Sequence, residues 1–333
     1  MTDYTMEMSP DIMAAIFGDY DSNIRKIENE LKVSIINRDG DVRITGATEA
    51  VRKAVRLIHQ LIDTVNLGVE ITSQNIDYNI SRFDDSSSAD ISKIHEAVIC
   101  KTIKGRWIRP KTIGQKKYVD MIRNKMIVFA SGPAGTGKTY LAMAMAITAF
   151  KNNEVNRIIL TRPAIEAGEK LGFLPGDLQS KVDPYLRPLY DALYEIMGAE
   201  QFLKNMERGL IEVAPLAYMR GRTLDNAFIV LDEAQNTTPA QMKMCLTRIG
   251  FNSKAIITGD LSQNDLEGKK QSGLDIGIQV VGSIKEIGVM NLSSQDVVRH
   301  PLVQKIVEAY EHYENRPIKL SEGSKNEASN KET

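Results

Sequence analysis

Residues 126–139 decide the fold, and they read Met-Ile-Val-Phe-Ala-Ser-Gly-Pro-Ala-Gly-Thr-Gly-Lys-Thr. Residues 126–130 form an apolar run typical of a strand buried on both faces, and the apolar stretch 141–150 predicts a helix. Between them, residues 132–139 match the pattern G-x-x-x-x-G-K-[ST], which holds phosphate groups when it connects a strand to a helix. The sequence therefore predicts a nucleotide-binding loop.

Each residue type in this loop has a chemical reason. Glycines let backbone N–H groups converge on phosphate oxygens, and the following helix adds the positive end of its dipole. We expect Lys138 to reach the β and γ phosphates and the Thr139 hydroxyl to ligate Mg²⁺. The residues predicted to bind the nucleotide are Gly132, Pro133, Ala134, Gly135, Thr136, Gly137, Lys138 and Thr139. A Gly-rich turn without a ligand would leave Lys138 and Thr139 unexplained.

Strands and helices alternate beyond this loop. Strands are predicted at 157–161, 211–214, 228–231 and 255–258, and helices at 177–197, 241–249 and 302–313. Unbroken apolar strands that alternate with helices indicate an α/β fold with a parallel sheet.

The first 80 residues follow a different pattern. Apolar residues recur at helical spacing over 23–31, and two alternating strands at 33–36 and 42–45 flank the hairpin signal Asp39-Gly40. Thr48 is a candidate N-cap for a further amphipathic helix. We predict a small α+β domain over 1–80, a basic linker over 81–110, the nucleotide-binding domain over 111–316 and a disordered tail over 317–333.

Composition excludes several classes of protein. The chain has 333 residues, 42% of them hydrophobic and 26% charged, which is typical of a soluble globular protein with about two domains. Apolar runs stay short of the roughly 18 residues of a membrane span, and residues 1–10 lack a signal peptide's basic charge, so we expect a cytoplasmic protein without a membrane partner. Cys100 and Cys245 lie far apart, which predicts buried free thiols.

The net charge of −1 hides an asymmetry along the chain. Residues 1–80 hold 8 Lys and Arg against 13 Asp and Glu, a net charge of −5. Residues 81–125 hold 11 against 5, a net charge of +6. The basic charge therefore lies in the connector and not in the N-terminal domain.

Two carboxylates, Asp232 and Glu233, follow the predicted strand 228–231 directly. Ligands of an open α/β sheet collect at the carboxyl ends of its strands. We expect Asp232 to hold Mg²⁺ together with Thr139, and Glu233 to accept a proton from the attacking water. An acidic pair that complements a helix dipole is the alternative. Gln263, beyond strand 255–258, could sense the γ-phosphate, or belong to an ordinary turn capped by Asp260.

These motifs resemble those of two groups of ATPases. Asp232-Glu233-Ala234-Gln235 followed by Gly259-Asp260-x-x-Gln263 resembles superfamily 1 helicases, and Gln115 lies upstream of the phosphate loop like their adenine-reading glutamine. More specifically, the chain resembles the PhoH-like ATPase family in four segments: residues 132–139, 161–176 (TRPAIEAGEKLGFLPG), 217–223 (AYMRGRT) and 297–301 (VVRHP). The resemblance covers about residues 100–315. It implies a single RecA-like core that binds and hydrolyses ATP with Mg²⁺ and takes part in RNA metabolism.

The N-terminal domain is similar to a KH domain, which many members of that family carry. A KH domain grips RNA with a GXXG loop before a helix, whereas this chain has Gly18-Asp19-Tyr20-Asp21-Ser22 there. An RNA clamp and a docking or oligomerisation domain both remain open. Basic residues also surround Trp107 in the sequence: Lys101, Lys104, Arg106, Arg109, Lys111, Lys116 and Lys117. They either contact RNA, with Trp107 as a stacking ring, or form a solvated connector whose Trp107 packs on the core. By analogy with helicases, Arg162 and Lys170 are candidates for contact with a nucleic-acid backbone.

The chain has length for only one RecA-like core, whereas superfamily 1 helicases close ATP between two. We therefore expect a homo-oligomeric ring, a hexamer, in which a neighbour supplies an arginine. Arg220, Arg222 and Arg299 are the candidates, and an ordinary ion pair is the alternative for each. The leading hypothesis is an ATPase that unwinds RNA or remodels RNA–protein complexes. The alternatives are a nucleotide-dependent adaptor for an rRNA-processing endoribonuclease or ribosomal partner, which the resemblance implies, and a small-molecule kinase.

Overall fold

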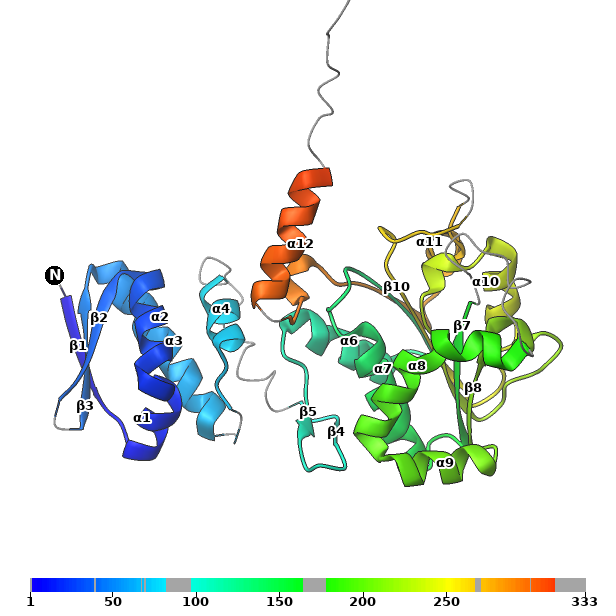
Figure 1. Cartoon of the computed structure of the whole chain (residues 1–333), viewed down its shortest axis with the longest axis horizontal. Coiled ribbons are helices and arrows are strands. Elements are labelled where there is room, and N and C mark those ends of the chain that lie inside the picture. The colour runs from blue at the N-terminus through cyan, green and yellow to red at the C-terminus, as the bar shows by residue number, and fades with distance from the viewer. Residues whose placement is uncertain are drawn as a thin grey trace, which may run out of the picture. The chain divides into compact units, whose positions relative to one another are not determined.

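The computed structural model describes residues 2–38, 40–66, 68, 70–81, 97–163, 178–266, 271–299 and 301–314. They fall into two compact units, Met1–Val298 and Arg299–Thr333. The first unit contains a three-stranded sheet near the N-terminus and a larger six-stranded sheet (Figure 1). The small sheet shares one hydrophobic core with its helices, and the large sheet has a core on each face. Residues 164–177, with Lys170 and most of the second resemblance motif, lie outside the described residues, as do the predicted tail and residues 82–96 of the predicted linker.

The N-terminal domain is an antiparallel sheet of order β1-β3-β2 with helices packed on one face (Figure 1). Its elements are β1 (Thr2–Glu7), α1 (Pro10–Phe17), the 3₁₀ turn η1 (Asp19–Asp21), α2 (Ser22–Leu31), β2 (Val33–Arg38), β3 (Asp41–Gly46), α3 (Thr48–Asn66) and α4 (Ser73–Ser81). Val42 and Ile44 of β3 are fully buried while their neighbour Arg43 is exposed, which is the period-two pattern of a half-buried strand.

The hairpin prediction is confirmed. Arg38 of β2 pairs with Asp41 of β3 as the last pair of an antiparallel hairpin, and Gly40 just before β3 has a φ of 93°. Strand β1 is absent from the sequence prediction because only Met6 of its six residues is buried. Its position is determined instead by backbone pairing with β3, from Thr2 opposite Gly46 to Glu7 opposite Asp41.

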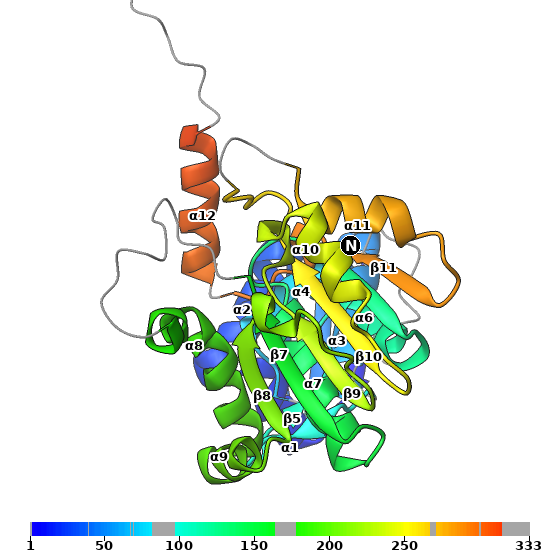
Figure 2. The same cartoon turned by 90° about the vertical axis from the view of Figure 1, so that its right-hand side faces the viewer.

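The larger sheet is parallel throughout, with strand order β11-β6-β10-β9-β7-β8. The sequence prediction of an α/β fold with a parallel sheet is therefore confirmed. The strands are β6 (Ile127–Ser131), β7 (Arg157–Arg162), β8 (Ile211–Pro215), β9 (Ala227–Leu231), β10 (Lys254–Gly259) and β11 (Ile287–Asn291). The helices are α6 (Ile113–Asn124), α7 (Lys138–Lys151), α8 (Leu178–Met197), α9 (Ala199–Glu207), α10 (Pro239–Leu246) and α11 (Gly273–Val281), and Figure 2 shows helices on both sides of the strands.

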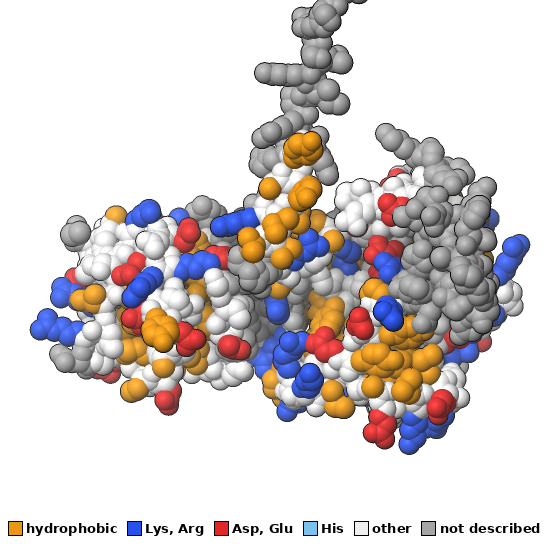
Figure 3. Space-filling model, in the orientation of Figure 1, with side chains coloured by type: hydrophobic (Ala, Val, Ile, Leu, Met, Phe, Trp, Pro, Cys, Tyr) orange, Lys and Arg blue, Asp and Glu red, His pale blue; other side chains and the backbone are white. Residues whose placement is uncertain are grey.

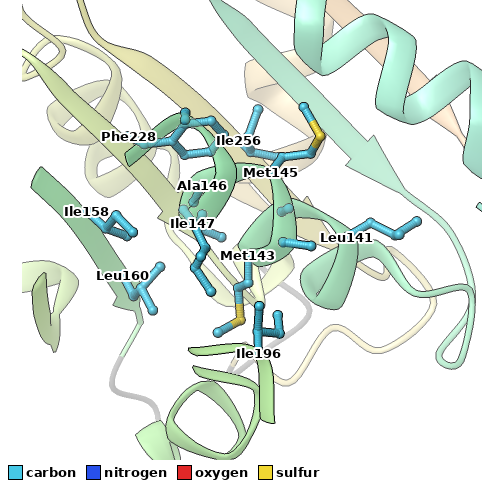
Figure 4. Close-up of a cluster of buried hydrophobic side chains, with 14 of the residues drawn as sticks. Leu141, Met143, Met145, Ala146, Ile147, Ile158, Leu160, Ile196, Phe228 and Ile256 are labelled. Carbon is cyan, nitrogen blue, oxygen red and sulfur yellow. The ribbon is translucent and has the colours of Figure 1, made fainter. Parts of the chain in front are cut away.

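Both faces of this sheet are buried, as the unbroken apolar strands predict. Phe228 and Val230 of β9 join one core, whereas Ile229 and Leu231 join the other. Figure 4 shows the first core, in which α7 contributes Met143 and Ile147 and meets side chains from β7, β9, β10 and α8. Burial of α7 between neighbours fixes the helix that begins at Lys138, and so fixes the loop in front of it.

The segment 97–110, which falls within the predicted basic linker, forms a short antiparallel hairpin. Its strands are β4 (Cys100–Lys101) and β5 (Trp107–Ile108). Ile99 and Ile108 are buried in the same core as α7, and Thr148 of α7 donates to the carbonyl of Ile99 (3.3 Å). These residues are therefore packed against the domain of the six-stranded sheet, and only their outward side chains carry the basic charge.

The second unit contains helix α12 (Pro301–Glu314), close to the predicted bounds 302–313. Leu302, Tyr310 and Tyr313 are exposed on it. Among the helices that the structure describes, none is both long and apolar enough to cross a membrane.

Candidate functional site

The phosphate loop begins where β6 ends, between the edge strand β11 and the strand β10 of the parallel sheet. Strand β6 reaches Ser131, the loop occupies Gly132 to Gly137, and α7 begins at Lys138. Gly132 has a φ of 149°, and a Cβ there would collide with the backbone carbonyl of Leu292. This position therefore requires glycine, because the loop lies directly against the chain that leaves the neighbouring strand β11.

The Lys138 amine lies within the loop. Its Nζ donates to the carbonyls of Gly132 (2.6 Å) and Pro133 (2.8 Å), and the Thr136 hydroxyl donates to Pro133 as well (2.9 Å). Tyr118 of α6 donates to the carbonyl of Lys138 (3.2 Å), and burial next to the negative charge of Asp232 raises the pKa of Tyr118 well above 10. Tyr118 therefore stays protonated and holds the first turn of α7 in place.

A cavity of about 270 Å³ opens in front of this loop. Strands β6, β9 and β10 all deliver residues to it from their carboxyl ends, which is where an open α/β sheet binds ligands. It is lined by Ala134, Gly135, Gly137, Lys138, Thr139, Tyr140, Asp232, Glu233, Gly259, Asp260 and Gln263. The structure thus brings the loop together with the two carboxylates and the glutamine that the sequence singles out.

Thr139 and Asp232 are in direct contact. The Thr139 hydroxyl donates to Asp232 Oδ1 (2.6 Å), and the buried Thr258 of β10 donates to the same oxygen (2.8 Å). Asp232 is itself 6% exposed, and its backbone N–H donates to Thr161 of β7. Its carboxylate is therefore fixed by two neighbouring strands, with an oxygen donor set of the kind that Mg²⁺ prefers.

Glu233 is held between two donors. Arg162, the last residue of β7, donates from Nη2 to Glu233 Oε1 (2.7 Å), and Gln235 donates from Nε2 to Glu233 Oε2 (2.6 Å). The backbone of Glu233 has a φ of 51°, which is uncommon outside glycine and asparagine. Residues in such conformations cluster at functional sites, where the surrounding structure enforces them.

Gln235 connects Glu233 to the loop that follows β10. Its side-chain oxygen accepts from the backbone N–H of Asp260 (3.0 Å), and it is 1% exposed. Asp260 in turn accepts from both the N–H and the hydroxyl of Ser262, and its carbonyl accepts from the N–H of Gln263 (3.0 Å). A continuous chain of hydrogen bonds therefore joins Arg162, Glu233, Gln235 and the turn that carries Gln263.

Gln115 is buried behind the phosphate loop. Its Nε2 donates to the carbonyl of Thr136 (3.1 Å), and its Oε1 accepts from the backbone N–H of Lys111 (2.6 Å). Thr112 caps α6 and donates to the buried carboxylate of Asp296 (2.6 Å). The Gln115 amide thus connects α6 to the phosphate loop, and these two bonds fix its orientation.

The candidate arginines differ in their surroundings. Arg222 donates to both carboxylate oxygens of Glu212 (2.6 and 2.7 Å), which raises the pKa of Arg222, and it does not line the cavity. Arg220 is exposed, and Arg299 belongs to the second unit.

Gln235 and Thr258 are among the residues of the site to which the sequence assigns no role. Gln235 belongs to the Asp-Glu-Ala-Gln motif, and Thr258 ends an apolar strand. Both residues therefore lie in segments that the sequence already indicates as functional. Their partners, Glu233 and Asp232, could be recognised only once β9 and β10 were known to be adjacent.

Comparison with known proteins gives two family matches. The description "PhoH-like protein" matches residues 107–311, and the description "KH domain" matches residues 3–60. A PhoH-like protein of Bacillus subtilis is 50% identical, with 93% of this chain and 99% of that protein covered. A PhoH-like protein of Mycobacterium tuberculosis is 48% identical (96% and 93% covered), and protein PhoH of Escherichia coli is 46% identical over 59% of this chain and 56% of its own length.

Two solved structures are similar at a lower level. Dim2p from Pyrococcus horikoshii OT3 is 18% identical with a TM-score of 0.20, over 24% of this chain and 49% of that chain. The SWI2/SNF2 ATPase core of Sulfolobus solfataricus in complex with dsDNA is 16% identical with a TM-score of 0.32, over 54% of this chain and 43% of that chain. The relatives of near-equal length, together with a family match over more than half of the residues, settle the classification. The chain belongs to the PhoH-like protein family and carries a KH domain in front of the domain with the six-stranded parallel sheet.

Proposed function

We propose that this protein hydrolyses ATP in a Mg²⁺-dependent reaction. The observation that carries the proposal is the 270 Å³ cavity itself, which brings Lys138, Thr139, Asp232, Glu233 and Gln263 together in front of one phosphate loop. A P-loop enzyme needs a cation for the β and γ phosphates, a metal site beside them and a group that activates water, and these side chains supply all three.

Each residue has a proposed role that follows from its position. Lys138, whose amine now donates to loop carbonyls, exchanges those contacts for phosphate oxygens. Thr139 and Asp232, in contact at 2.6 Å, hold Mg²⁺, which when bound neutralises the charge that develops on the phosphates. Glu233 accepts a proton from water, and Gln263 senses the γ-phosphate.

Steady-state ATP hydrolysis with two variants tests this assignment. Lys138→Ala should abolish turnover by removing the phosphate-binding cation, whereas Glu233→Gln should bind ATP with near-normal affinity and turn it over at least a hundredfold more slowly. Phe251→Ala truncates an exposed aromatic residue outside the cavity and serves as the control. Hydrolysis at the wild-type rate in both site variants would refute the proposal.

We further propose that nucleic acid controls this reaction through Arg162. The ion pair with Arg162 and the hydrogen bond from Gln235 each occupy an oxygen of Glu233, so a water molecule must compete with these two donors for the carboxylate. A phosphate of an RNA backbone is a competing anion for the same guanidinium, and arginine binds phosphate in the same forked geometry as carboxylate. RNA binding at Arg162 would release Glu233 and raise the rate of hydrolysis.

The KH domain supports an RNA partner, but its loop favours a second candidate function. The loop between α1 and α2 carries Asp19 and Asp21, and Tyr20 between them is 94% exposed. Acidic side chains repel a phosphate backbone. This observation favours a nucleotide-dependent adaptor in which the KH domain docks onto a protein, such as an rRNA-processing endoribonuclease or a ribosomal protein. ATP hydrolysis that is indifferent to RNA, together with ATP-dependent capture of a purified partner of this kind, would favour the adaptor.

We also propose that a neighbouring subunit completes the site in a homo-oligomeric ring. The proposal rests on the single parallel sheet and on three arginines, Arg220, Arg222 and Arg299. Arg222 forms an ion pair with Glu212. Arg220 is therefore a better candidate than Arg222 for the arginine that enters the site of a neighbouring subunit. Sedimentation with ATP should show an assembly, and Arg220→Ala should lower turnover about 10³-fold or more without changing the assembly. A monomer that hydrolyses ATP at the full rate would refute the ring.

A further inference from the structure

A second cavity, of about 250 Å³, adjoins the phosphate cavity. It shares Gly135, Gly137 and Tyr140 with the first cavity, and the β5 residue Trp107 contributes to its wall. The two cavities therefore border the same stretch of the phosphate loop, one on the side of Lys138 and Asp232 and the other on the side of Trp107 and Gln115. In an ATP molecule, the part that extends away from the phosphates is the ribose and the base.

Trp107 is presented to this cavity by a rigid hairpin. Its neighbour Ile108 is 4% exposed in the core, while the Trp107 side chain alternates outward and is 50% exposed. Lys101, paired with Trp107 across the hairpin, places its Nζ 5.0 Å from the centre of the ring. The backbone N–H of Ile99 donates to the carbonyl of Ile108 (2.9 Å), which ties the hairpin together. The indole is therefore held in position before any ligand arrives.

The charges around Trp107 suit an anionic ligand. Arg106, Arg109 and Lys111 line the same cavity, and Figure 3 shows basic side chains gathered over the β4–β5 hairpin. Arg106 forms an ion pair with Glu195 of α8, next to Tyr140, which donates to the same carboxylate (3.2 Å). Burial, together with the positive charge of Arg106, lowers the pKa of Lys111. A cluster of cations beside a phosphate loop favours a polyphosphate ligand over a neutral one.

We propose that Trp107 is the stacking platform for the base of the bound nucleotide. From the sequence, the basic and aromatic segment 101–117 is either an RNA contact or a solvated connector. Under this proposal, it binds the nucleoside half of the protein's own nucleotide instead. A flat aromatic face stacks on any base, so the platform adds affinity for the nucleoside without selecting one base over another. This inference rests on the proposed nucleotide binding and adds a subsite to it.

The experiment uses Trp107 as its own probe, because it is the single tryptophan of the chain. The full-length protein is titrated with ADP, with ATP and Mg²⁺, and with inorganic tripolyphosphate while tryptophan emission is recorded. We expect ADP and ATP to change the emission and tripolyphosphate to bind without that change. By calorimetry, Trp107→Ala should weaken ADP binding roughly tenfold and leave tripolyphosphate binding unchanged, while Trp107→Phe should retain most of the ADP affinity.

Each other outcome has a definite meaning. Equal weakening of ADP and tripolyphosphate, or unchanged ADP affinity in Trp107→Ala, would overturn the stacking role. Emission that responds to single-stranded RNA without nucleotide, with RNA affinity alone lost in Trp107→Ala, would assign the platform to RNA and overturn it as well. Wild-type protein that binds neither ADP nor tripolyphosphate would refute the proposed ATP site instead, so the two failures are distinguishable. Phe251→Ala, an aromatic truncation outside both cavities, should bind all three ligands like the wild type.

Discussion

At the scale of single residues, Glu233 is hydrogen-bonded to other side chains of the site. Its two oxygens meet Arg162 and Gln235, and Gln235 passes the contact on to Asp260 and the turn of Gln263. The candidate base is thus bonded directly to Arg162 and Gln235, and through Gln235 it is connected to the turn that carries Gln263. A sequence motif names such residues separately, whereas the structure shows that they act on one another.

Gln115→Glu should weaken the binding of every ligand of the phosphate loop. The new carboxylate oxygen would face the carbonyl of Thr136, where the amide of Gln115 now donates at 3.1 Å, and two buried acceptors repel each other. We expect roughly a 5- to 100-fold loss in affinity for ADP and for tripolyphosphate alike, measured by calorimetry. Selective loss of ADP alone would show that Gln115 contacts the base without supporting the loop.

Cys245 should be unreactive until the protein unfolds. Burial raises the pKa of Cys245 to about 12, and the residue is 2% exposed. At pH 8.5 its thiolate fraction is then roughly a thousandfold below that of an unfolded cysteine. Because the unfolded thiol loses its proton near pH 9 and the folded one does not, the stability linked to Cys245 is present below pH 9 and is lost between pH 9 and about 12.

Mass spectrometry after treatment with iodoacetamide checks this prediction. Cys100, which is only partly buried on β4, should be labelled first, although burial also raises its pKa. Labelling of Cys245 should appear only in denaturant. Equal labelling rates of the two thiols in native protein would contradict the burial of α10.

At the scale of elements, the alternation along β9 makes a quantitative prediction. Phe228 is 1% exposed in one core, so Phe228→Ala should lower the free energy of unfolding by about 3–5 kcal/mol through lost burial and the cavity left behind. Phe251→Ala is the matched control, since Phe251 is 86% exposed and should change stability by less than about 0.5 kcal/mol. Urea unfolding followed by circular dichroism measures both. Equal effects of the two substitutions would contradict the assigned faces of β9.

Some elements of the fold could be predicted from the sequence alone, and others could not. The strands β6, β7, β9 and β10 and the helix α7 could be predicted because each is a strong apolar run beside a motif, and the chemistry of Lys138, Thr139, Asp232 and Glu233 follows from type and spacing. β1 and β5 could not, because each buries a single side chain; β1 depends on pairing with the distant strand β3, and β5 is only two residues long. The Arg162–Glu233 pair joins residues 71 positions apart and requires β7 and β9 to be neighbours.

At the scale of the whole molecule, the N-terminal domain and the domain of the six-stranded sheet differ in charge. The N-terminal domain carries a net charge of −5 and an acidic loop where a KH domain would hold RNA. The domain of the six-stranded sheet carries the basic hairpin and the cavity. We therefore propose that both ATP hydrolysis and its control by nucleic acid belong to the domain of the six-stranded sheet, and that the KH domain selects a partner.

The most direct test of this account is the rate of ATP hydrolysis with and without single-stranded RNA, in the wild type and in Arg162→Ala, with Glu233→Gln as the blank. If Arg162 restrains Glu233, RNA should stimulate the wild type, and Arg162→Ala should hydrolyse ATP faster than the wild type without RNA and respond little when RNA is added. Arg162→Lys, which keeps the charge but loses the forked geometry, should fall between the two. An Arg162→Ala variant that is slow without RNA and still stimulated by it would contradict the coupling.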